Sequence, residues 1–166
     1  MTKSHTTDVK LMLRERANVY LRVADLSPVV EQAAAACVTA LRAGGTLWAC
    51  GNGGSAAQAQ HFAAELVGRY RRERDALRAV SLTDNVCTVT SVSNDYEFAD
   101  VFARQLRGMA KRGDVLLAFT TSGNSKNVLR ALEEAKRVGI ESICFLGRDG
   151  GFTKGVATLE LIVPGN

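Results

Sequence analysis

Apolar positions along the chain follow two patterns that alternate. Residues spaced three and four apart predict two N-terminal helices, one over Val9–Val23 and one that begins at Pro28, with Ser27 as its N-cap, and stops at Gly44-Gly45. Further helices are predicted over residues 55–68, 85–92, 98–111 and 126–138. Short, continuous apolar runs occupy residues 46–50, 77–82, 115–119, 142–146 and 159–163.

Apolar runs that alternate with helices are typical of βαβ units, which form a parallel sheet with helices on both faces. We therefore predict an α/β fold of three layers, α/β/α, with a five-stranded, flavodoxin-like, doubly wound sheet preceded by N-terminal helices. The chain is expected to form one structural domain, with residues 1–44 as a helical segment for oligomerisation and residues 45–166 as the sheet domain. Ligands of such sheets bind at the carboxyl ends of the strands.

Composition narrows the class of protein. A chain of 166 residues with 46% apolar and 23% charged residues fits one globular domain and excludes a disordered chain. No apolar stretch approaches the length of a membrane span, and the polar N-terminus lacks the apolar segment of a signal peptide. The four cysteines (Cys37, Cys50, Cys87 and Cys144) form no CxxC pair, so we expect reduced core residues of a cytoplasmic protein.

The net charge of +4 comes largely from the arginine-rich segment 69–78. Such a segment is either a solvated face or a nucleic-acid site. Tyr70 is the only aromatic residue within it, which favours the solvated face, so we expect no nucleic-acid partner. The charge is also compatible with a small anionic ligand.

Two loops that follow predicted strands open directly into helices. Gly51-Asn52-Gly53-Gly54-Ser55 offers glycines and the N–H groups of a helix start, and Thr120-Thr121-Ser122-Gly123-Asn124-Ser125 offers hydroxyl groups. The first is neither a dinucleotide fingerprint nor a P-loop, and either loop taken alone could be a capped turn. Because both lie at strand ends of one sheet, we favour a phosphate-binding site.

Two pairs of polar residues are further candidates. His61 and Glu65 are four residues apart on the helix after the first loop, so they can share a divalent metal such as zinc, and Glu65 can act as a general base. The alternative is an ordinary surface pair. Asn94 and Asp95, after the short helix 85–92, could hold polyol hydroxyl groups or form an Asx turn.

Together these residues resemble the sugar isomerase (SIS) domain, and within it the phosphoheptose isomerases, also called sedoheptulose 7-phosphate isomerases. The resemblance rests on Cys50-Gly-Asn-Gly-Gly-Ser55, His61-Phe-Ala-Ala-Glu-Leu-Val-Gly-Arg-Tyr70, Ser93-Asn-Asp-Tyr96 and Thr121-Ser-Gly-Asn-Ser125. It implies a cytoplasmic homotetramer that converts D-sedoheptulose 7-phosphate to D-glycero-D-manno-heptose 7-phosphate, for lipopolysaccharide or other glycans. Such a ketose–aldose isomerisation passes through an enediol.

The resemblance also implies roles for individual residues. Those that would contact the sugar phosphate are Asn52, Gly53, Gly54 and Ser55 in the first loop and Thr120, Thr121, Ser122 and Ser125 in the second. Asn94 and Asp95 would touch the polyol. His61 and Glu65 would bind one zinc ion per subunit, and Glu65 would also bind substrate and be the catalytic base.

In the family a C-terminal helix follows the fifth strand and supplies a Gln and a His to the zinc site. The chain ends at Asn166, before such a helix. Either the protein continues beyond these residues or it lacks the helix and is catalytically impaired, and residues 163–166 resemble the entry to a loop, which favours continuation. The competing functions are a non-catalytic SIS module that binds a protein such as the replication initiator, and a regulatory domain that binds phosphosugars. Glu65 favours the isomerase.

Overall fold

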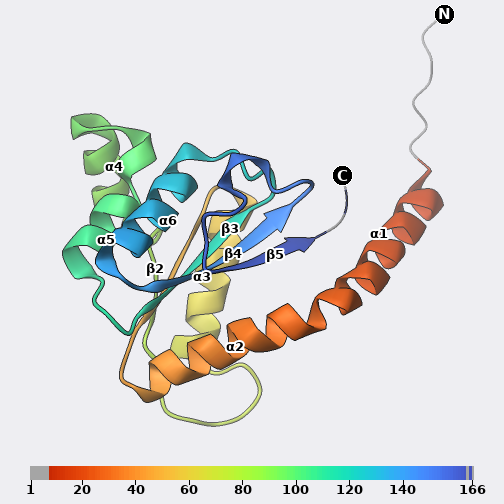
Figure 1. The fold of residues 1–166 in the computed structure, drawn as a ribbon, viewed down its shortest axis with the longest axis horizontal. Helices are drawn as coiled ribbons and strands as arrows, with labels where there is room; N and C mark the ends of the chain where they lie inside the picture. Colours follow the sequence, from red (N-terminus) through yellow and green to blue (C-terminus); the bar gives the residue numbers. More distant parts are fainter. Residues whose placement is uncertain (1–7, 164, 166) are drawn as a thin grey trace, which may run out of the picture.

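The computed structural model describes residues 8–163 and 165, and these residues form one parallel sheet of five strands in the order β2-β1-β3-β4-β5, with helices on both faces (Figure 1). The strands are β1 (Leu47–Gly51), β2 (Ala79–Ser81), β3 (Val115–Thr120), β4 (Glu141–Gly147) and β5 (Leu159–Val163). The α-helices are α1 (Val9–Val23), α2 (Ser27–Arg42), α3 (Gly54–Val67), α4 (Val86–Asp95), α5 (Ala103–Met109) and α6 (Lys126–Val138). The predicted three-layer α/β fold is confirmed.

Alternate residues of the central strands pack into two separate cores. Trp48, Leu116 and Cys144 face the layer that contains α4, α5 and α6. Leu47, Leu117 and Ile143 face α2 and α3. Because both faces are buried, the central strands are apolar along their whole length, which is why they appear as continuous runs in the sequence.

The start of the two central strands is tied together by a buried carboxylate. Asp114, which is 2% exposed, accepts hydrogen bonds from the backbone N–H groups of Thr46 (2.8 Å) and Lys111 (3.0 Å) and from Nε1 of Trp48 (2.9 Å). A buried donor left without an acceptor costs about 1–3 kcal/mol. The carboxylate therefore stabilises the junction where β1 and β3 begin.

Local structure departs from the sequence prediction at three places. Ser27 does not cap α2, because the 3₁₀ turn η1 (Ala24–Leu26) continues the chain in helical geometry from α1 into α2. The predicted helix 98–111 is broken into the 3₁₀ turn η2 (Phe98–Asp100) and α5. Helix α4 runs three residues past its predicted end, so Asn94 and Asp95 lie in its last turn rather than after it.

The two N-terminal helices differ in how they pack. Helix α2 lies against the sheet, with Ala33 and Ala40 buried, whereas no side chain of α1 is buried. Helix α1 precedes α2 in the chain and extends away from it, beyond the sheet (Figure 1). Its apolar residues Leu13 and Tyr20 are 66% and 78% exposed.

The cysteines agree in part with the core positions expected for them. All four cysteines are free thiols; Cys50 and Cys144 are buried, and burial raises the pKa of Cys144 to about 12. Cys87 is exposed on α4, so the prediction of a core position is wrong for this residue. Within the described part of the chain, no helix has the length and apolar character needed to cross a membrane.

An ion-pair network joins α5 to α6. The carboxylate of Glu134 is 5% exposed and accepts hydrogen bonds from Nε of Arg137 (2.9 Å) and from Nη2 of Arg107 (2.9 Å). Hydrogen bonds from Arg137 first, and then from Arg107, lower the pKa of Glu134 from 4.5 to about 2, although burial opposes the shift.

Glu134 should make the stability of the fold depend on pH in acid. Because its folded pKa is depressed, the stabilisation is complete above the unfolded value of 4.5 and is lost as the pH falls toward about 2. We expect the free energy of unfolding, measured by urea titration from pH 6 to pH 2.5, to fall more steeply for the wild type than for Glu134→Gln. Equal slopes for the two proteins would contradict this assignment.

Candidate active site

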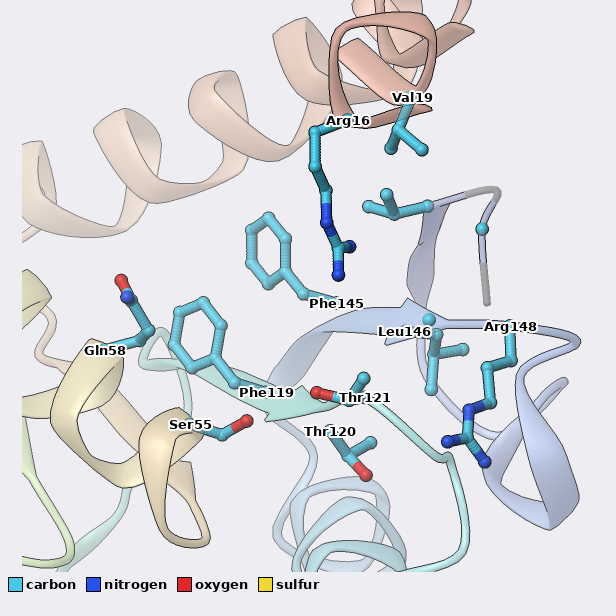
Figure 2. Close-up of a pocket in the computed structure, with 13 residues that line it drawn as sticks. Arg16, Val19, Ser55, Gln58, Phe119, Thr120, Thr121, Phe145, Leu146 and Arg148 are labelled. Atoms are coloured by element: carbon cyan, nitrogen blue, oxygen red, sulfur yellow. The ribbon is translucent and has the colours of Figure 1, made fainter. Parts of the chain in front are cut away.

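A cavity of about 270 Å³ opens at the carboxyl ends of β3 and β4 (Figure 2). It brings together Ser55 from α3 with Thr120 and Thr121 from the end of β3, three of the residues expected to contact a sugar phosphate. The stacked rings of Phe119 and Phe145, with centroids 4.8 Å apart, form an apolar wall. The cavity therefore combines a hydroxyl-lined part with an apolar part, as is common in sites for small ligands.

The loop after β1 is shaped by its glycines. Gly53 adopts φ +54° and is the N-cap residue of α3, so the cap has no side chain. A Cβ on Gly51 would lie 2.7 Å from atoms of Ser55, so only glycine allows this close turn. Ser55 lies inside the helix and does not cap it, which removes the simplest structural explanation for the loop. The N–H groups of Ser55 and Ala56 donate to the carbonyl oxygens of Asn52 (2.9 Å) and Gly53 (3.0 Å), so the N–H groups that the helix start can offer to a ligand are those of Gly53 and Gly54.

The loop after β3 is held by its own hydroxyl groups. Oγ1 of Thr120 accepts a hydrogen bond from the N–H of Gly123 (3.2 Å) and donates one to Oγ of Ser125 (3.5 Å). Oγ of Ser122 accepts from the N–H of Asn124 (3.2 Å). Ser125 is the N-cap residue of α6 but makes no side-chain capping bond. Hydroxyl and N–H groups thus meet at a helix start, an arrangement suited to a phosphate.

A third loop, residues 148–153 after β4, braces the loop after β3. Thr153 donates hydrogen bonds from both its N–H and its Oγ1 to the carbonyl oxygen of Gly123, each at 3.0 Å. The N–H of Phe152 donates to Oδ1 of Asn124 at 3.2 Å. A Cβ on Gly123 would lie 1.9 Å from the carbonyl oxygen of Gly150, so the two loops can approach this closely only with glycine at position 123.

Sequence reasoning missed a residue that joins the first two loops. Asn127, in the first turn of α6, is 3% exposed and exchanges two hydrogen bonds of 2.8 Å with the side chain of Asn52. Its signal in the sequence was a polar residue on the buried face of α6, in line with Ala131 and Ala135.

Two arginines of the cavity wall were also missed. Arg16 reaches in from α1, beside Phe145, and Arg148 comes from the loop after β4 (Figure 2). Arg148 has φ +54°, a conformation that non-glycine residues rarely adopt. Its position after the fourth strand was a usable signal, whereas Arg16 looks like any exposed helical residue in the sequence. Both bring positive charge to a site built otherwise from neutral groups.

His61 and Glu65 lie farther along α3. Nε2 of His61 is 3.5 Å from Oε1 of Glu65, and the two side chains are 70% and 32% exposed. They share one side of the helix with Gln58, which lines the cavity, because the three residues are spaced by three and four positions. By type and spacing the pair fits two positions of a zinc site, which takes three or four protein ligands. In residues 8–163 and 165, no further His, Cys, Asp or Glu completes such a group.

Asn94 and Asp95 are not among the residues that line the cavity. They are exposed in the last turn of α4, where Nδ2 of Asn94 donates a hydrogen bond to Oδ1 of Asp95 at 2.9 Å. The structure thus brings together the loops after β1 and β3, and this pair lies outside the lining of the cavity.

Parts of the arginine-rich segment have structural partners. The guanidinium group of Arg74 donates hydrogen bonds to the carbonyl oxygens of Glu65 (2.7 Å) and Leu66 (2.8 Å), which satisfies acceptors at the end of α3. Arg69 pairs with Glu73 at 3.5 Å. Arg74 therefore supports the helix turn that carries Glu65.

Comparisons with known proteins agree with this geometry. A family model described as the SIS domain matches residues 13–147. A phosphoheptose isomerase from Geobacter sp. (strain M21) is 47% identical over 160 residues, which cover 96% of this chain and 83% of the relative. Solved structures of phosphoheptose isomerases from Neisseria gonorrhoeae and Francisella tularensis give TM-scores of 0.89 and 0.91, at 38% and 36% identity; each match covers 95% of this chain and 85% of the other.

The fold and the site define a domain of the sugar isomerase class. The chain belongs to the SIS-domain family and, within it, to the phosphoheptose isomerases, and it is an isomerase. The resemblance inferred from the four motifs is confirmed.

Gly123→Ala should damage the site more than the fold. The added Cβ would clash with the carbonyl oxygen of Gly150, and the backbone of residue 123 has φ +64°, which alanine rarely adopts. We therefore expect the free energy of unfolding to fall by about 1–3 kcal/mol, and the affinity for inorganic phosphate to fall as well.

The matched control is Gly44→Ala. Gly44 has φ +78° but has open space around its Cβ position, and it precedes β1, at the opposite end of that strand from the loop after β1. The Gly44→Ala variant should have a lower free energy of unfolding but an unchanged affinity for inorganic phosphate, measured by calorimetry. Equal phosphate affinity in both variants would contradict a role for the loop after β3 in binding.

Proposed function

We propose that the chain isomerises D-sedoheptulose 7-phosphate to D-glycero-D-manno-heptose 7-phosphate. The observation that carries the proposal is the 47% identity with a phosphoheptose isomerase over 96% of the chain. The cavity adds chemical support, since Ser55, Thr120 and Thr121 offer hydroxyl groups to a phosphate.

The phosphate would lie at the two loops, anchored by Gly53, Gly54 and Ser55, which follow Asn52 in the first loop, and by Thr120, Thr121, Ser122 and Ser125 in the second. Ser55 and Glu65 are ten residues apart on α3, a rise of about 15 Å. The Glu65 side chain leans toward the helix N-terminus, as helical side chains do, which shortens that distance. An extended seven-carbon sugar with its phosphate at the loops would therefore direct its C1 and C2 toward Glu65.

Glu65 would act as the base. Its carboxylate takes a proton from C1 of the ketose, which gives an enediolate with the negative charge on O2. A proton then passes from the C1 hydroxyl group to O2, and the carboxylate returns its proton to C2 to form the aldose. The phosphate loops contribute by holding the reacting carbons in place, because a fixed geometry lowers the entropic part of the barrier. Asn94 and Asp95 remain our candidates for holding polyol hydroxyl groups.

Glu65→Gln tests the proposal. The amide keeps the shape of the side chain but cannot accept the proton, so we expect turnover of sedoheptulose 7-phosphate to fall by about 10²–10⁴-fold. Binding of the sugar phosphate should change little.

The matched control is Glu133→Gln, at an exposed position of α6, which should keep full activity. If Glu65→Gln retained activity, Glu65 would not be the base. If the wild type bound sugar phosphates but turned none over, the chain would be a binding module rather than this isomerase.

We also propose that His61 and Glu65 hold one zinc ion per subunit. When bound, the ion would stabilise negative charge on the enediolate oxygen. The pair is accessible, and its 3.5 Å separation suits two ligands of one ion.

Zinc binding can be measured without activity. Equilibrium dialysis should give one zinc ion per wild-type subunit, and His61→Ala should weaken binding by at least about tenfold, because the ion loses one of few protein ligands. Cys87→Ser, which removes an exposed thiol, is the control and should bind zinc as the wild type does. Unchanged binding by His61→Ala would rule out this pair as the metal site.

Residues 1–44 would form the oligomerisation segment of a homotetramer. Exposed apolar side chains of α1, among them Leu13 and Tyr20, support this proposal, because they are otherwise left to solvent. Sedimentation that showed a stable monomer at micromolar concentration would contradict it.

The product would supply heptose for lipopolysaccharide or other glycans. The reaction would take place in the cytoplasm, a location supported by the free thiols.

A further inference from the structure

We infer that Asn127 is a positioning residue of the sugar-phosphate site, which acts by holding the side chain of Asn52 and so fixes the loop after β1 against the loop after β3. The inference rests on the proposed function for the identity of the ligand. It assigns a role to a residue outside the loop motifs and changes the role expected for Asn52, from a direct contact to a residue that sets loop spacing.

The two amides form a closed pair. Nδ2 of Asn52 donates to Oδ1 of Asn127 and Nδ2 of Asn127 donates to Oδ1 of Asn52, both at 2.8 Å. An amide has two N–H donors and two oxygen lone pairs, so the pair uses one donor and one acceptor of each side chain. Asn127 is 3% exposed, and losing its partner would leave a buried amide unsatisfied, which is more costly than losing an exposed hydrogen bond.

The pair is placed where the strands no longer hold the loops together. The β1–β3 ladder ends with Gly51 opposite Phe119, one residue before Asn52 and Thr120. Across the described residues, these two hydrogen bonds are the only ones that join the segment 52–55 to the segment 120–127. They therefore set the separation between the helix start at Gly53 and Gly54 and the hydroxyl groups that would hold the other side of the phosphate.

The loop after β3 is already fixed on its far side. Thr153 bonds to the carbonyl oxygen of Gly123, and Phe152 bonds to Asn124. Within the part of the chain that the structure describes, no hydrogen bond other than those from Asn127 ties the loop after β1 to a neighbouring loop. Breaking the amide pair should then release the first loop while the second keeps its shape, so the defect should be in binding rather than in the chemical step.

The experiment is a double-mutant cycle on Asn52→Ala, Asn127→Ala and the double variant, with kcat and KM for sedoheptulose 7-phosphate measured well below each unfolding midpoint. Each single variant should raise KM roughly tenfold and change kcat less, and the double variant should be no worse than either single, because one substitution already breaks the pair. If Asn127→Ala left KM unchanged while Asn52→Ala raised it, or if the double variant showed the product of the two effects, Asn52 would contact the ligand independently and the inference would fail.

Gln105→Ala is the matched structural control. Gln105 is also a buried amide with two hydrogen bonds, to the carbonyl oxygens of Leu82 and Val101, but it lies away from both loops. It should lower the unfolding midpoint and leave KM unchanged. If Asn127→Ala does not fold, Asn127→Leu, which nearly preserves the side-chain volume, replaces it in the cycle with the same expected result.

Failure of the proposed function would be visible separately. If the wild type does not turn over sedoheptulose 7-phosphate, that proposal fails, and the same variants are compared by calorimetric binding of inorganic phosphate. The inference then requires the same roughly tenfold, non-additive loss of affinity. A wild type that binds neither sedoheptulose 7-phosphate nor inorganic phosphate would overturn both.

Discussion

The parallel pairing of β1 with β3 is the constraint on which the site depends. The two strands are adjacent in the sheet although more than sixty residues of chain separate them, and they end within one residue of each other. Parallel strands that end together deliver their following loops to the same edge of the sheet. The buried carboxylate of Asp114 secures the start of this pairing, and the amide pair of Asn52 and Asn127 extends it beyond the last ladder residue.

The proposed site separates binding from chemistry along one helix. The start of α3 contributes N–H groups and Ser55 to the phosphate end, and two to three turns later the same helix carries His61 and Glu65. A rigid helix keeps the separation between these two ends constant, so that anchoring the phosphate also positions the far end of the sugar. Arg74 stabilises this arrangement from the other end, because it satisfies the carbonyl oxygens of Glu65 and Leu66.

Sequence patterns predicted what depends on local periodicity and missed what depends on contacts between loops. The strands, α1 and α6 were predicted well because burial imposes continuous or regularly spaced apolar residues. The break before α5 was missed, since Phe98 and Val101 continue a helical spacing that the chain does not follow. Asn127 and Arg16 belong to the site only through their position in space, and no pattern in their own segments links Asn127 to Asn52.

The most direct test of Glu65 as the catalytic base follows the proton that it would remove. The wild-type protein, supplied with zinc, is incubated with sedoheptulose 7-phosphate in heavy water, and deuterium is followed by NMR. An enediol mechanism with Glu65 as the base predicts deuterium at C1 of the remaining ketose and at C2 of the aldose, because the abstracted proton exchanges with solvent while the base holds it. Formation of the aldose with no solvent deuterium at either carbon, or binding of the sugar phosphate with no exchange, would contradict Glu65 as a solvent-exchanging base in an enediol mechanism.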